Sequence, residues 1–444
     1  MASVQFKLEQ PELEFTTSGG SEVRRTVLPC GVRVLTETMP AAQSASVSFS
    51  VAVGSRDEID GQFGSTHFLE HLLFKGTKSR TALEIAVAFD SVGGASNAVT
   101  GKEHTSYYAR VQDKAVPVAV EVIADMLTSS IIDPVEFENE RTVILEELAM
   151  NDDDPQDVAH EEFFGAVLAG HPLGRPIGGT VETISAVDRE SVWSHYQANY
   201  RPKDLVITAA GGIDHAELLE MVTSNLEKAG WDLAVASSPR SWRNKVLSPE
   251  VAAASVKIIK RPIAQANIII GNPGLVGSDD RRYAMAILNT VLGGGMSSRL
   301  FQEIREKRGL AYSVYSFNQG YSDGAAFGLY AGCSPAKAKE VTKLMLEELE
   351  KIANQGITMD ELNLAKGNIS GGLALKFEST QARMSRLSSA ELTDGEFIDL
   401  DEALARFDSV SLEDVQRVAQ AMAKAEHSFV AVGDLSEDLF DEFR

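Results

Sequence analysis

Apolar and polar residues alternate along residues 46–53, where Val47, Phe49, Val51 and Val53 take every second position. A period of two is typical of a strand with one buried face. The segment is therefore predicted to be a half-buried strand.

Two helices are predicted after this strand, because apolar residues now recur every three or four positions. The first begins at Ser65 or Thr66, either of which can serve as its N-cap, and ends near Gly76. The second covers residues 82–92 and ends at a pair of glycines.

A longer helix is predicted from Asp133 to about Met150. Asp133 supplies the N-cap, Pro134 takes the first helical position, and Glu136 completes a capping box. This is a strong helix start, and it places the acidic residues downstream on a helix.

The second half of the chain repeats the pattern of the first. A helix and then a buried strand occupy residues 188–211, and the same order returns at 411–433. Residues 268–270 match the strand at 46–53, and residues 283–292 match the helix that follows that strand. Self-similarity over half of the chain indicates two copies of one α/β domain.

The length of 444 residues also argues for more than one domain, because a single core rarely grows so large. We predict an N-terminal domain at 18–230, an irregular linker at 231–255, and a homologous C-terminal domain at 256–444. The second domain has no histidine in the helix at 283–292, so any histidine-based chemistry belongs to the first domain.

The segment His67-Phe68-Leu69-Glu70-His71 lies in the first predicted helix. His67 and His71 are four positions apart and share one face, with Glu70 at its edge. Two such imidazoles can hold Zn²⁺, and a nearby carboxylate can take a proton from water. The order His-x-x-Glu-His is a metallopeptidase signature. The alternative is an exposed helix that carries two histidines and an acid.

Glu140 and Glu147 share one face of the helix at 133–150, because seven positions span two turns. Val143 and Ile144 lie between them, and carboxylates on an apolar stripe need a metal or a histidine as a partner. The alternative is that both are surface acids paired with Arg141. These residues alone leave both interpretations open.

Composition excludes several function classes. Hydrophobic residues make up 44% and charged residues 24%, as in soluble globular proteins, and no apolar run reaches the length of a membrane span. A net charge of −23 disfavours nucleic acid as a partner and would favour basic peptides if the acids lined a site.

The number of cysteines and the N-terminal residues indicate in which cellular compartment the protein is expected. Cys30 and Cys333 are too few for a disulfide framework, which fits a reducing environment. Residues 1–17 are polar and acidic and contain no signal or transit segment. A cytoplasmic location is expected.

A glycine-rich stretch at 292–301 follows neither the dinucleotide nor the P-loop spacing, so a phosphate site is not indicated. A helix is predicted at 298–308, closed by Gly309, and a strand at 311–317.

These features together resemble the pitrilysin family of zinc metallopeptidases. The match is to its short members, the catalytic β-subunit of mitochondrial processing peptidase and its bacterial relatives. It covers about residues 26–435. The matching motifs are His67 through Thr77, Asn97-Ala98 with Lys102-Glu103, Glu140 through Glu147, and Arg305 through Tyr312.

The resemblance implies a metal site. His67, His71 and Glu147 would bind one Zn²⁺ per chain. Glu146 is the rival of Glu147 as the third ligand, and the helical face shared with Glu140 favours Glu147.

The resemblance also implies roles around the metal. Glu70 would be the catalytic base, and Glu140 would orient a metal ligand. Asn97 would hold the substrate backbone. Arg305 and Tyr312, from the half without the metal, would bind substrate, with Tyr312 also donating a hydrogen bond during catalysis.

The implied fold is α+β, with two homologous α/β-sandwich domains that face each other as a clamshell. Each domain would be an antiparallel-rich sheet with helices packed on it. The implied function is zinc-dependent endopeptidase activity on peptides or unfolded segments in an enclosed chamber. A homodimer, or a heterodimer with an inactive paralogue, is expected, and neither nucleic acid nor a membrane is an expected partner. The alternative function is a non-catalytic partner subunit of a peptidase or respiratory complex.

Overall fold

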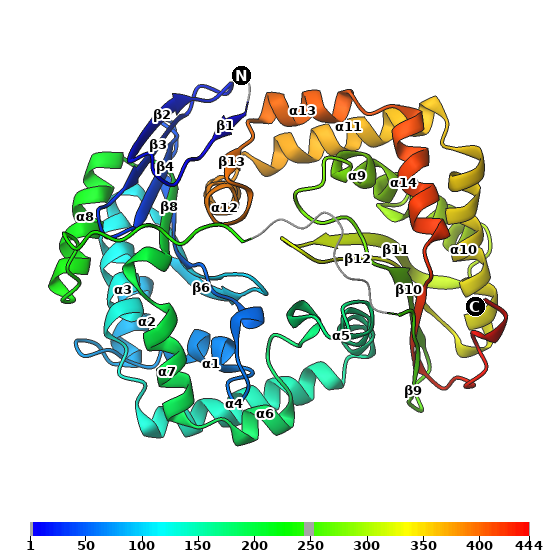
Figure 1. Ribbon diagram of the computed structural model, residues 1–444, viewed down its shortest axis with the longest axis horizontal. Coiled ribbons are helices and arrows are strands. Elements are labelled where there is room, and N and C mark those ends of the chain that lie inside the picture. Colours follow the sequence, from blue (N-terminus) through cyan, green and yellow to red (C-terminus); the bar gives the residue numbers. More distant parts are fainter. Residues whose placement is uncertain (1–2, 244–252, 444) are drawn as a thin grey trace. The chain divides into compact units, whose positions relative to one another are not determined.

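The computed structural model describes residues 3–243 and 253–443 (Figure 1). Its contacts divide the chain into two compact units. Unit 1 comprises Met1–Leu148, Pro176–Arg243 and Leu373–Ala403, and unit 2 comprises Ala149–Arg175, Asn244–Gly372 and Leu404–Arg444. Among the described residues, no helix combines the length and the apolar character that a membrane crossing requires.

Unit 1 is built on a seven-stranded sheet in the order β2-β3-β4-β8-β5-β7-β6. Neighbouring strands are antiparallel except β4 and β8, which are parallel. The strands are β2 (Glu12–Thr16), β3 (Glu22–Val27), β4 (Arg33–Thr38), β5 (Ser44–Val51), β6 (Ala95–Thr100), β7 (Thr105–Gln112) and β8 (Leu205–Gly211). A short pair, β1 (Val4–Gln5) and β13 (Glu396–Phe397), forms a separate two-stranded sheet.

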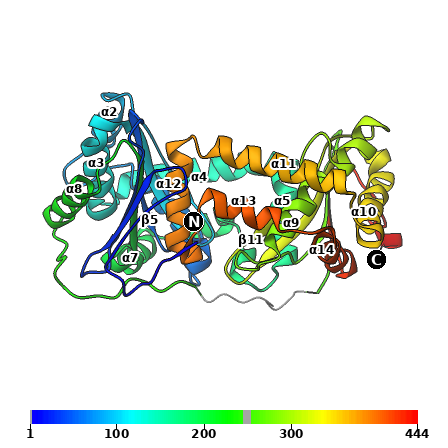
Figure 2. The ribbon, with the colours of Figure 1, turned by 90° about the horizontal axis from the view of Figure 1, so that it is seen from above.

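The strand predicted at 46–53 is β5, and both of its faces are buried rather than one. Its apolar face packs in the main core with α3, while its serine face contacts α12. Ser46 Oγ lies 2.9 Å from Thr380 Oγ1 of that helix. Figure 2 shows α12 beside β5. Small polar side chains suit this face because they hydrogen-bond to a helix that packs closely on them.

The helices of unit 1 pack around this sheet. They are α1 (Ser65–Leu72), α2 (Ala82–Asp90), α3 (Val116–Ser129), α6 (Val181–Ala186), α7 (Arg189–Asn199), α8 (His215–Lys228) and α12 (Thr380–Ser389). Three further helices, α4 (Pro134–Asp152), α11 (Met359–Lys376) and α13 (Leu400–Asp408), contain residues of both units.

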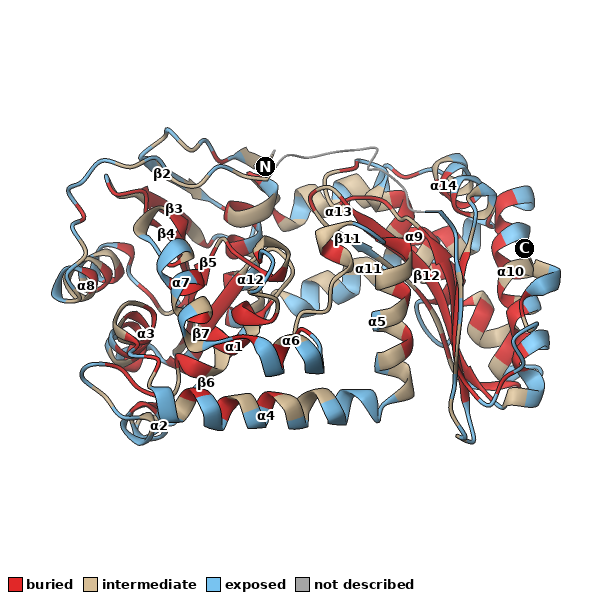
Figure 3. Cartoon of the chain, turned by 60° about the horizontal axis from the view of Figure 1, so that its bottom comes forward, coloured by how far each residue is buried: buried red, intermediate tan, exposed pale blue. Residues whose placement is uncertain are grey.

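Unit 2 is built on a five-stranded sheet in the order β11-β12-β10-β14-β9. Its strands are β9 (Val256–Lys260), β10 (Ala266–Asn272), β11 (Ala311–Gly320), β12 (Ala325–Cys333) and β14 (Ser428–Gly433). Its helices are α5 (Pro155–Val167), α9 (Arg282–Gly293), α10 (Ala338–Gln355) and α14 (Leu412–Lys424). Every residue of β12 is buried, as Figure 3 shows by its red colour.

The predicted internal repeat is confirmed by strand order. The order β6-β7-β5-β8-β4 in unit 1 matches β11-β12-β10-β14-β9 in unit 2, and each sheet has one parallel pair at the matching place. The prediction of an α+β chain with two homologous, antiparallel-rich domains is therefore confirmed.

The units differ from the predicted domain ranges, because each half of the chain lends a helix to the other unit. Helix α5, from the first half, packs on β10 and β14 of unit 2, and α12, from the second half, packs on β5 and β8 of unit 1. The range 18–230 thus contains the seven-stranded sheet except β2, but it also contains α5, which belongs to unit 2. The range 256–444 contains the five-stranded sheet, but it also contains α12, which belongs to unit 1. The predicted linker at 231–255 has no helix or strand up to residue 243, and residues 244–252 of it lie outside the described part.

Buried ion pairs hold the segment with α12 in unit 1. Arg25 Nε lies 2.7 Å from Glu391 Oε2, with both side chains fully buried, and Arg386 Nη2 lies 2.9 Å from Glu37 Oε2. Such charges can be buried because each has a partner at hydrogen-bond distance.

Two local predictions are corrected. Helix α1 has Gly64 as its N-cap, at φ 90°, instead of Ser65 or Thr66. Glu58 performs the capping, since its carboxylate accepts hydrogen bonds from the Gly64 and Thr66 amides at 2.9 and 2.7 Å. The helix predicted at 298–308 contains a π-helical turn at Phe301–Glu306.

Candidate metal centre

Helix α1 buries its apolar face and leaves its histidines on the other. Leu69 and Leu72 are buried in the core of unit 1, and Phe68 stacks on Phe137 of α4 with 4.5 Å between ring centroids. This stacking fixes α4 against α1. The acidic face of α4 therefore lies beside His67 and His71.

Three predicted ligands come together there. His67 Nε2 and His71 Nε2 are 3.3 Å apart, and Glu147 Oε2 lies 3.7 Å from the first and 3.5 Å from the second. Ligands that bind zinc tetrahedrally at about 2.0–2.1 Å are separated by about 3.3 Å. The donor set and its spacing therefore fit zinc. Within the described ranges, this is the one group of three such residues that could hold a metal ion.

Glu140 is not a surface acid paired with Arg141. It is 3% exposed, and its Oε2 accepts a hydrogen bond from His71 Nδ1 at 3.0 Å. Arg141 bonds instead to Glu138, with Nε 3.0 Å from Oε2. A proton held on His71 Nδ1 leaves the Nε2 lone pair free to bind a metal.

Lys75 completes this arrangement and was not predicted as a site residue. Its Nζ lies 2.7 Å from Glu140 Oε1 and supplies a positive charge for the buried carboxylate. Two signals in the sequence pointed to it: Lys75 lies within the family motif at 67–77, and it is four positions from His71 on the same predicted helical face.

Glu147 and Glu146 have different surroundings. Glu147 is partly buried beside both histidines, whereas Glu146 is exposed and is not part of the group that could hold a metal. The geometry thus favours Glu147, as the helical face shared with Glu140 does.

His67 is suited to bind a metal as a neutral ring. Burial, and then the neighbouring His71, lower the pKa of His67 below its ordinary value. The ring therefore stays neutral near pH 7. Its Nδ1 atom is buried and has no hydrogen-bond partner among the described residues.

Glu70 lies beside the edge strand β6, and Asn97 is part of that strand. Glu70 Oε2 accepts a hydrogen bond of 2.5 Å from Thr100 Oγ1, at the end of the strand. Asn97 is exposed, and its Oδ1 accepts a hydrogen bond of 2.8 Å from the amide of Ala98.

Arg305 and Tyr312 lie in unit 2. The Arg305 guanidinium is over the ring of Tyr312, 4.9 Å from its centroid, and Tyr312 is 76% exposed. The pair is thus preformed and accessible. Its contact with substrate stays a prediction.

Helix α9 is the counterpart of α1. Four buried positions of α1 and its C-cap, residues 68, 69, 72 and 73, recur in α9 at 287, 288, 291 and 292, an offset of 219 from Leu69 to Leu288. At this offset His67 corresponds to Ala286, and His71 to Thr290.

Helix α11 is the counterpart of α4. The offset from Asp133, before α4, to Thr358, before α11, is 225, and the same offset relates the buried residues Phe137 and Leu362. At this offset Glu140 corresponds to Ala365, and Glu147 to Gly372. All four metal-site positions therefore carry residues without a metal-binding side chain in unit 2, as the lack of a histidine predicted.

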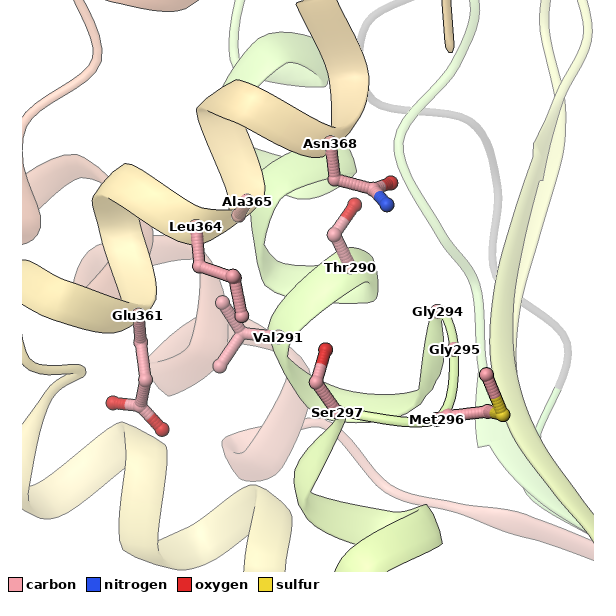
Figure 4. Close-up of a pocket in the computed structure, with 10 residues that line it drawn as sticks. All are labelled: Thr290, Val291, Gly294, Gly295, Met296, Ser297, Glu361, Leu364, Ala365 and Asn368. Atoms are coloured by element: carbon pink, nitrogen blue, oxygen red, sulfur yellow. The ribbon is translucent and has the colours of Figure 1, made fainter. Parts of the chain in front are cut away.

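A pocket of about 280 Å³ occupies this place in unit 2. Figure 4 shows Thr290 and Asn368 pointing toward each other across it, with Leu364 and Val291 beside them. Helices α1 and α4 thus enclose the predicted metal ligands, whereas the corresponding helices α9 and α11 enclose a pocket lined by apolar and polar side chains.

Comparison with known proteins agrees with this two-part organisation. Residues 33–181 match the family described as Insulinase (Peptidase family M16), and residues 186–369 match the Peptidase M16 inactive domain. The chain is 46% identical to an uncharacterized zinc protease of Streptomyces coelicolor, over 94% of this chain and 91% of that protein. It is 41% identical to an uncharacterized zinc protease of Mycobacterium leprae, over 93% and 92%.

A solved structure shares the fold. A protease from Helicobacter pylori, 24% identical, matches with a TM-score of 0.82 over 92% of this chain and 98% of that chain. Identity above 40% along nearly the whole length of the curated relatives, together with both family matches, means that this chain is a member of peptidase family M16.

Proposed function

We propose that the chain is a zinc-dependent endopeptidase with its metal held by His67, His71 and Glu147. The observation that carries the proposal is the spacing of their three donor atoms, 3.3 to 3.7 Å, beside the carboxylate of Glu70. The names of the relatives as zinc proteases support it. Three protein ligands leave a fourth coordination position for water or substrate, as catalytic zinc sites require.

Each residue around the metal then has a task. Zinc, when bound, supplies Lewis acidity that polarises a carbonyl and makes water more acidic. Glu70 takes the proton of the attacking water and passes it to the leaving amine. Glu140 holds His71 in the tautomer that binds the metal through Nε2.

Peptide substrates would add to strand β6. This strand is at the edge of the seven-stranded sheet, and an edge strand can pair with an extended peptide through its backbone groups. Thr100, at its end, contacts Glu70, so a peptide on β6 would run toward the catalytic base. Backbone pairing favours peptides and unfolded segments, and the net charge of −23 favours basic ones. Asn97, Arg305 and Tyr312 are proposed to bind this substrate.

The proposal is tested by comparing Glu70→Gln with the wild type in a peptide-cleavage assay and by metal analysis. The variant should keep one zinc per chain and lose peptidase activity, by about 10²- to 10⁴-fold. Full activity of Glu70→Gln would refute the role of Glu70. A wild type that binds zinc and cleaves no peptide would favour a non-catalytic partner subunit.

The third ligand is tested separately by Glu147→Gln and Glu146→Gln. Glu147→Gln should lose zinc, whereas Glu146→Gln, one position away on an exposed face, should keep it. Unchanged zinc occupancy in Glu147→Gln would refute the assignment. A dimer, either of identical chains or with an inactive paralogue, is part of the same proposal, and the mass of the purified protein in solution tests it.

A further inference from the structure

Among the described residues, Thr100 is the one that hydrogen-bonds to the Glu70 side chain. Its Oγ1 lies 2.5 Å from Glu70 Oε2, and Thr100 is 6% exposed. A hydroxyl that donates to a carboxylate at this distance makes a charge-assisted bond, which is stronger than a bond between neutral groups. The two residues are 30 positions apart, and neither the histidine motif nor the family resemblance singled out Thr100.

The backbone that follows Thr100 is hydrogen-bonded to the segment that follows β5. The amides of Ser55 and Arg56 donate to the carbonyls of Gly101 and Lys102, each at 3.1 Å. A Cβ on Gly54 would lie 2.4 Å from the carbonyl carbon of Lys102, so only glycine allows this close approach. The turn that follows Thr100 is therefore held by backbone contacts on a buried segment.

Side-chain charges hold the same turn. Arg56 Nη1 lies 2.7 Å from Glu103 Oε1, and Arg243 Nη2 donates to the Glu103 carbonyl at 2.9 Å. Thr100 also pairs with Thr105 to close the β6–β7 hairpin. A hydroxyl held on such a rigid support is preorganised to orient the group it contacts.

Both partners of this bond are absent from the corresponding place in unit 2. The β11–β12 hairpin closes with Gly320 paired to Ala325, so Gly320 stands where Thr100 stands in unit 1. At the offset of 219, Glu70 corresponds to Asn289. The threonine and the glutamate therefore occur together in the unit that has the metal ligands, and neither occurs at the matching position of the other unit.

We propose that Thr100 is a positioning residue for the catalytic base. Its hydroxyl holds Oε2 of Glu70, which fixes the carboxylate plane and leaves Oε1 to accept the proton of the attacking water. The proposal rests on the peptidase function proposed above. It predicts that loss of the hydroxyl slows the proton-transfer step while metal and substrate binding are kept.

The test compares Thr100→Val, which keeps the branched shape, with Thr100→Ser, which keeps the hydroxyl. Thr100→Val should lower kcat by about 10- to 100-fold, the worth of one hydrogen bond to a charged group, with KM and zinc content unchanged. Thr100→Ser should stay within about 3-fold of the wild type, since it restores the donor.

A matched control is Thr105→Val, on the paired strand. The Thr105 hydroxyl donates to the Val53 carbonyl at 3.0 Å and is fully buried, so its loss should lower the melting temperature. Because the Thr105 hydroxyl bonds to Val53 and not to Glu70, kcat per zinc-loaded chain should stay at the wild-type value. A merely structural role of Thr100 would make Thr100→Val behave like this control.

Coupling to the base is measured by a double-mutant cycle with Glu70→Gln. Adding Thr100→Val to Glu70→Gln should cause no further loss in kcat, because the hydroxyl acts through the carboxylate. Additive losses would overturn the proposal, as would an unchanged kcat in Thr100→Val or a Thr100→Ser variant as slow as Thr100→Val. If Thr100→Val does not fold, Thr100→Ala is judged by the same criteria.

The outcome also separates this inference from the proposed function. A zinc-loaded wild type without peptidase activity would overturn both. An active wild type that is sensitive to Glu70→Gln but insensitive to Thr100→Val would overturn only the role of Thr100.

Discussion

The two units of this chain share a sheet order and a pair of matching helices, but within the described residues only unit 1 has metal-binding side chains between those helices. Helix pairs α1/α4 and α9/α11 keep apolar residues at the same buried positions, as Phe137 and Leu362 show. At the positions of His71 and Glu147, unit 2 has Thr290 and Gly372.

This difference separates the residues that make the fold from those that make the chemistry. The buried positions face the core in both units, where a change of volume costs stability. The ligand positions face away from the core, so their side chains can change without unfolding the unit. A repeat can therefore lose its metal chemistry and still keep its structure.

The largest expected effect comes from paired substitutions at the matching positions His71 and Thr290. His71→Ala should abolish zinc binding and lower kcat/KM by about 10³-fold or more, because the Lewis acid is lost. Thr290→Ala should change neither, because the described residues of unit 2 include no group that could hold a metal ion. Zinc analysis and a peptide-cleavage assay measure both variants. Loss of zinc from Thr290→Ala would contradict the assignment of the metal to unit 1.

The next prediction concerns the pH dependence of stability. It compares His195 of α7 with Val418 of α14, which occupy corresponding positions at an offset of 223. Both are 2% exposed. His195 Nε2 lies 3.1 Å from Thr66 Oγ1 of the metal helix, and burial lowers the pKa of His195 to about 4. Its ordinary value is about 6.5.

Because the folded pKa of His195 is the lower one, the unfolded chain binds its proton first as the pH falls. The free energy of unfolding should therefore keep its full contribution from His195 above pH 6.5 and lose about 3 kcal/mol by pH 4. The variant His195→Gln should show a smaller loss of melting temperature over this range. Val418→Ala should lower the melting temperature by a similar amount at every pH. An unchanged pH dependence in His195→Gln would show that His195 is not the responsible group.

Local patterns in the sequence were sufficient to predict β5, α1, the repeat, and the helical faces that His67 shares with His71 and Glu140 with Glu147. These features depend on periodicity and on spacing within one helix, whereas the combination of the two faces in one metal site was implied by the family resemblance. The exchange of α5 and α12 could not be predicted, because it depends on contacts between distant segments. The ion pair of Arg25 with Glu391, for example, joins two residues that look like surface charges in the sequence.

The supporting residues of the site escaped prediction for the same reason. Thr100 and Lys75 contact Glu70 and Glu140 only because β6 and α4 are folded against α1. The capping of α1 by Glu58 likewise needs the turn that brings its carboxylate to the helix start. Sequence spacing identifies ligands that share a helix, whereas the groups that orient them come from other elements.

A smaller effect is expected from Glu140→Gln. Ala365 stands at this position in unit 2, which needs no group to orient a ligand. Glu140→Gln should weaken zinc binding by about 10- to 100-fold, since the amide is a poorer acceptor for the His71 Nδ1 proton. Competition with a chelator measures the affinity. Glu138→Gln is the matched control on the same helix, because Glu138 contacts Arg141 and should leave zinc binding unchanged.

The smallest expected effect tests α11, which contains three glycines where its counterpart α4 has none. A Cβ on Gly367 would have open space around it, whereas a Cβ on Gly293, in α9, would lie 2.2 Å from the Ser316 amide nitrogen. Gly367→Ala should therefore raise the free energy of unfolding by about 0.5–1 kcal/mol, because alanine favours the helix. Gly293→Ala should lower it, since the sheet has to move. Denaturant titration measures the change in the free energy of unfolding for both variants. A destabilised Gly367→Ala would show that α11 needs its glycine at this position for a reason other than packing.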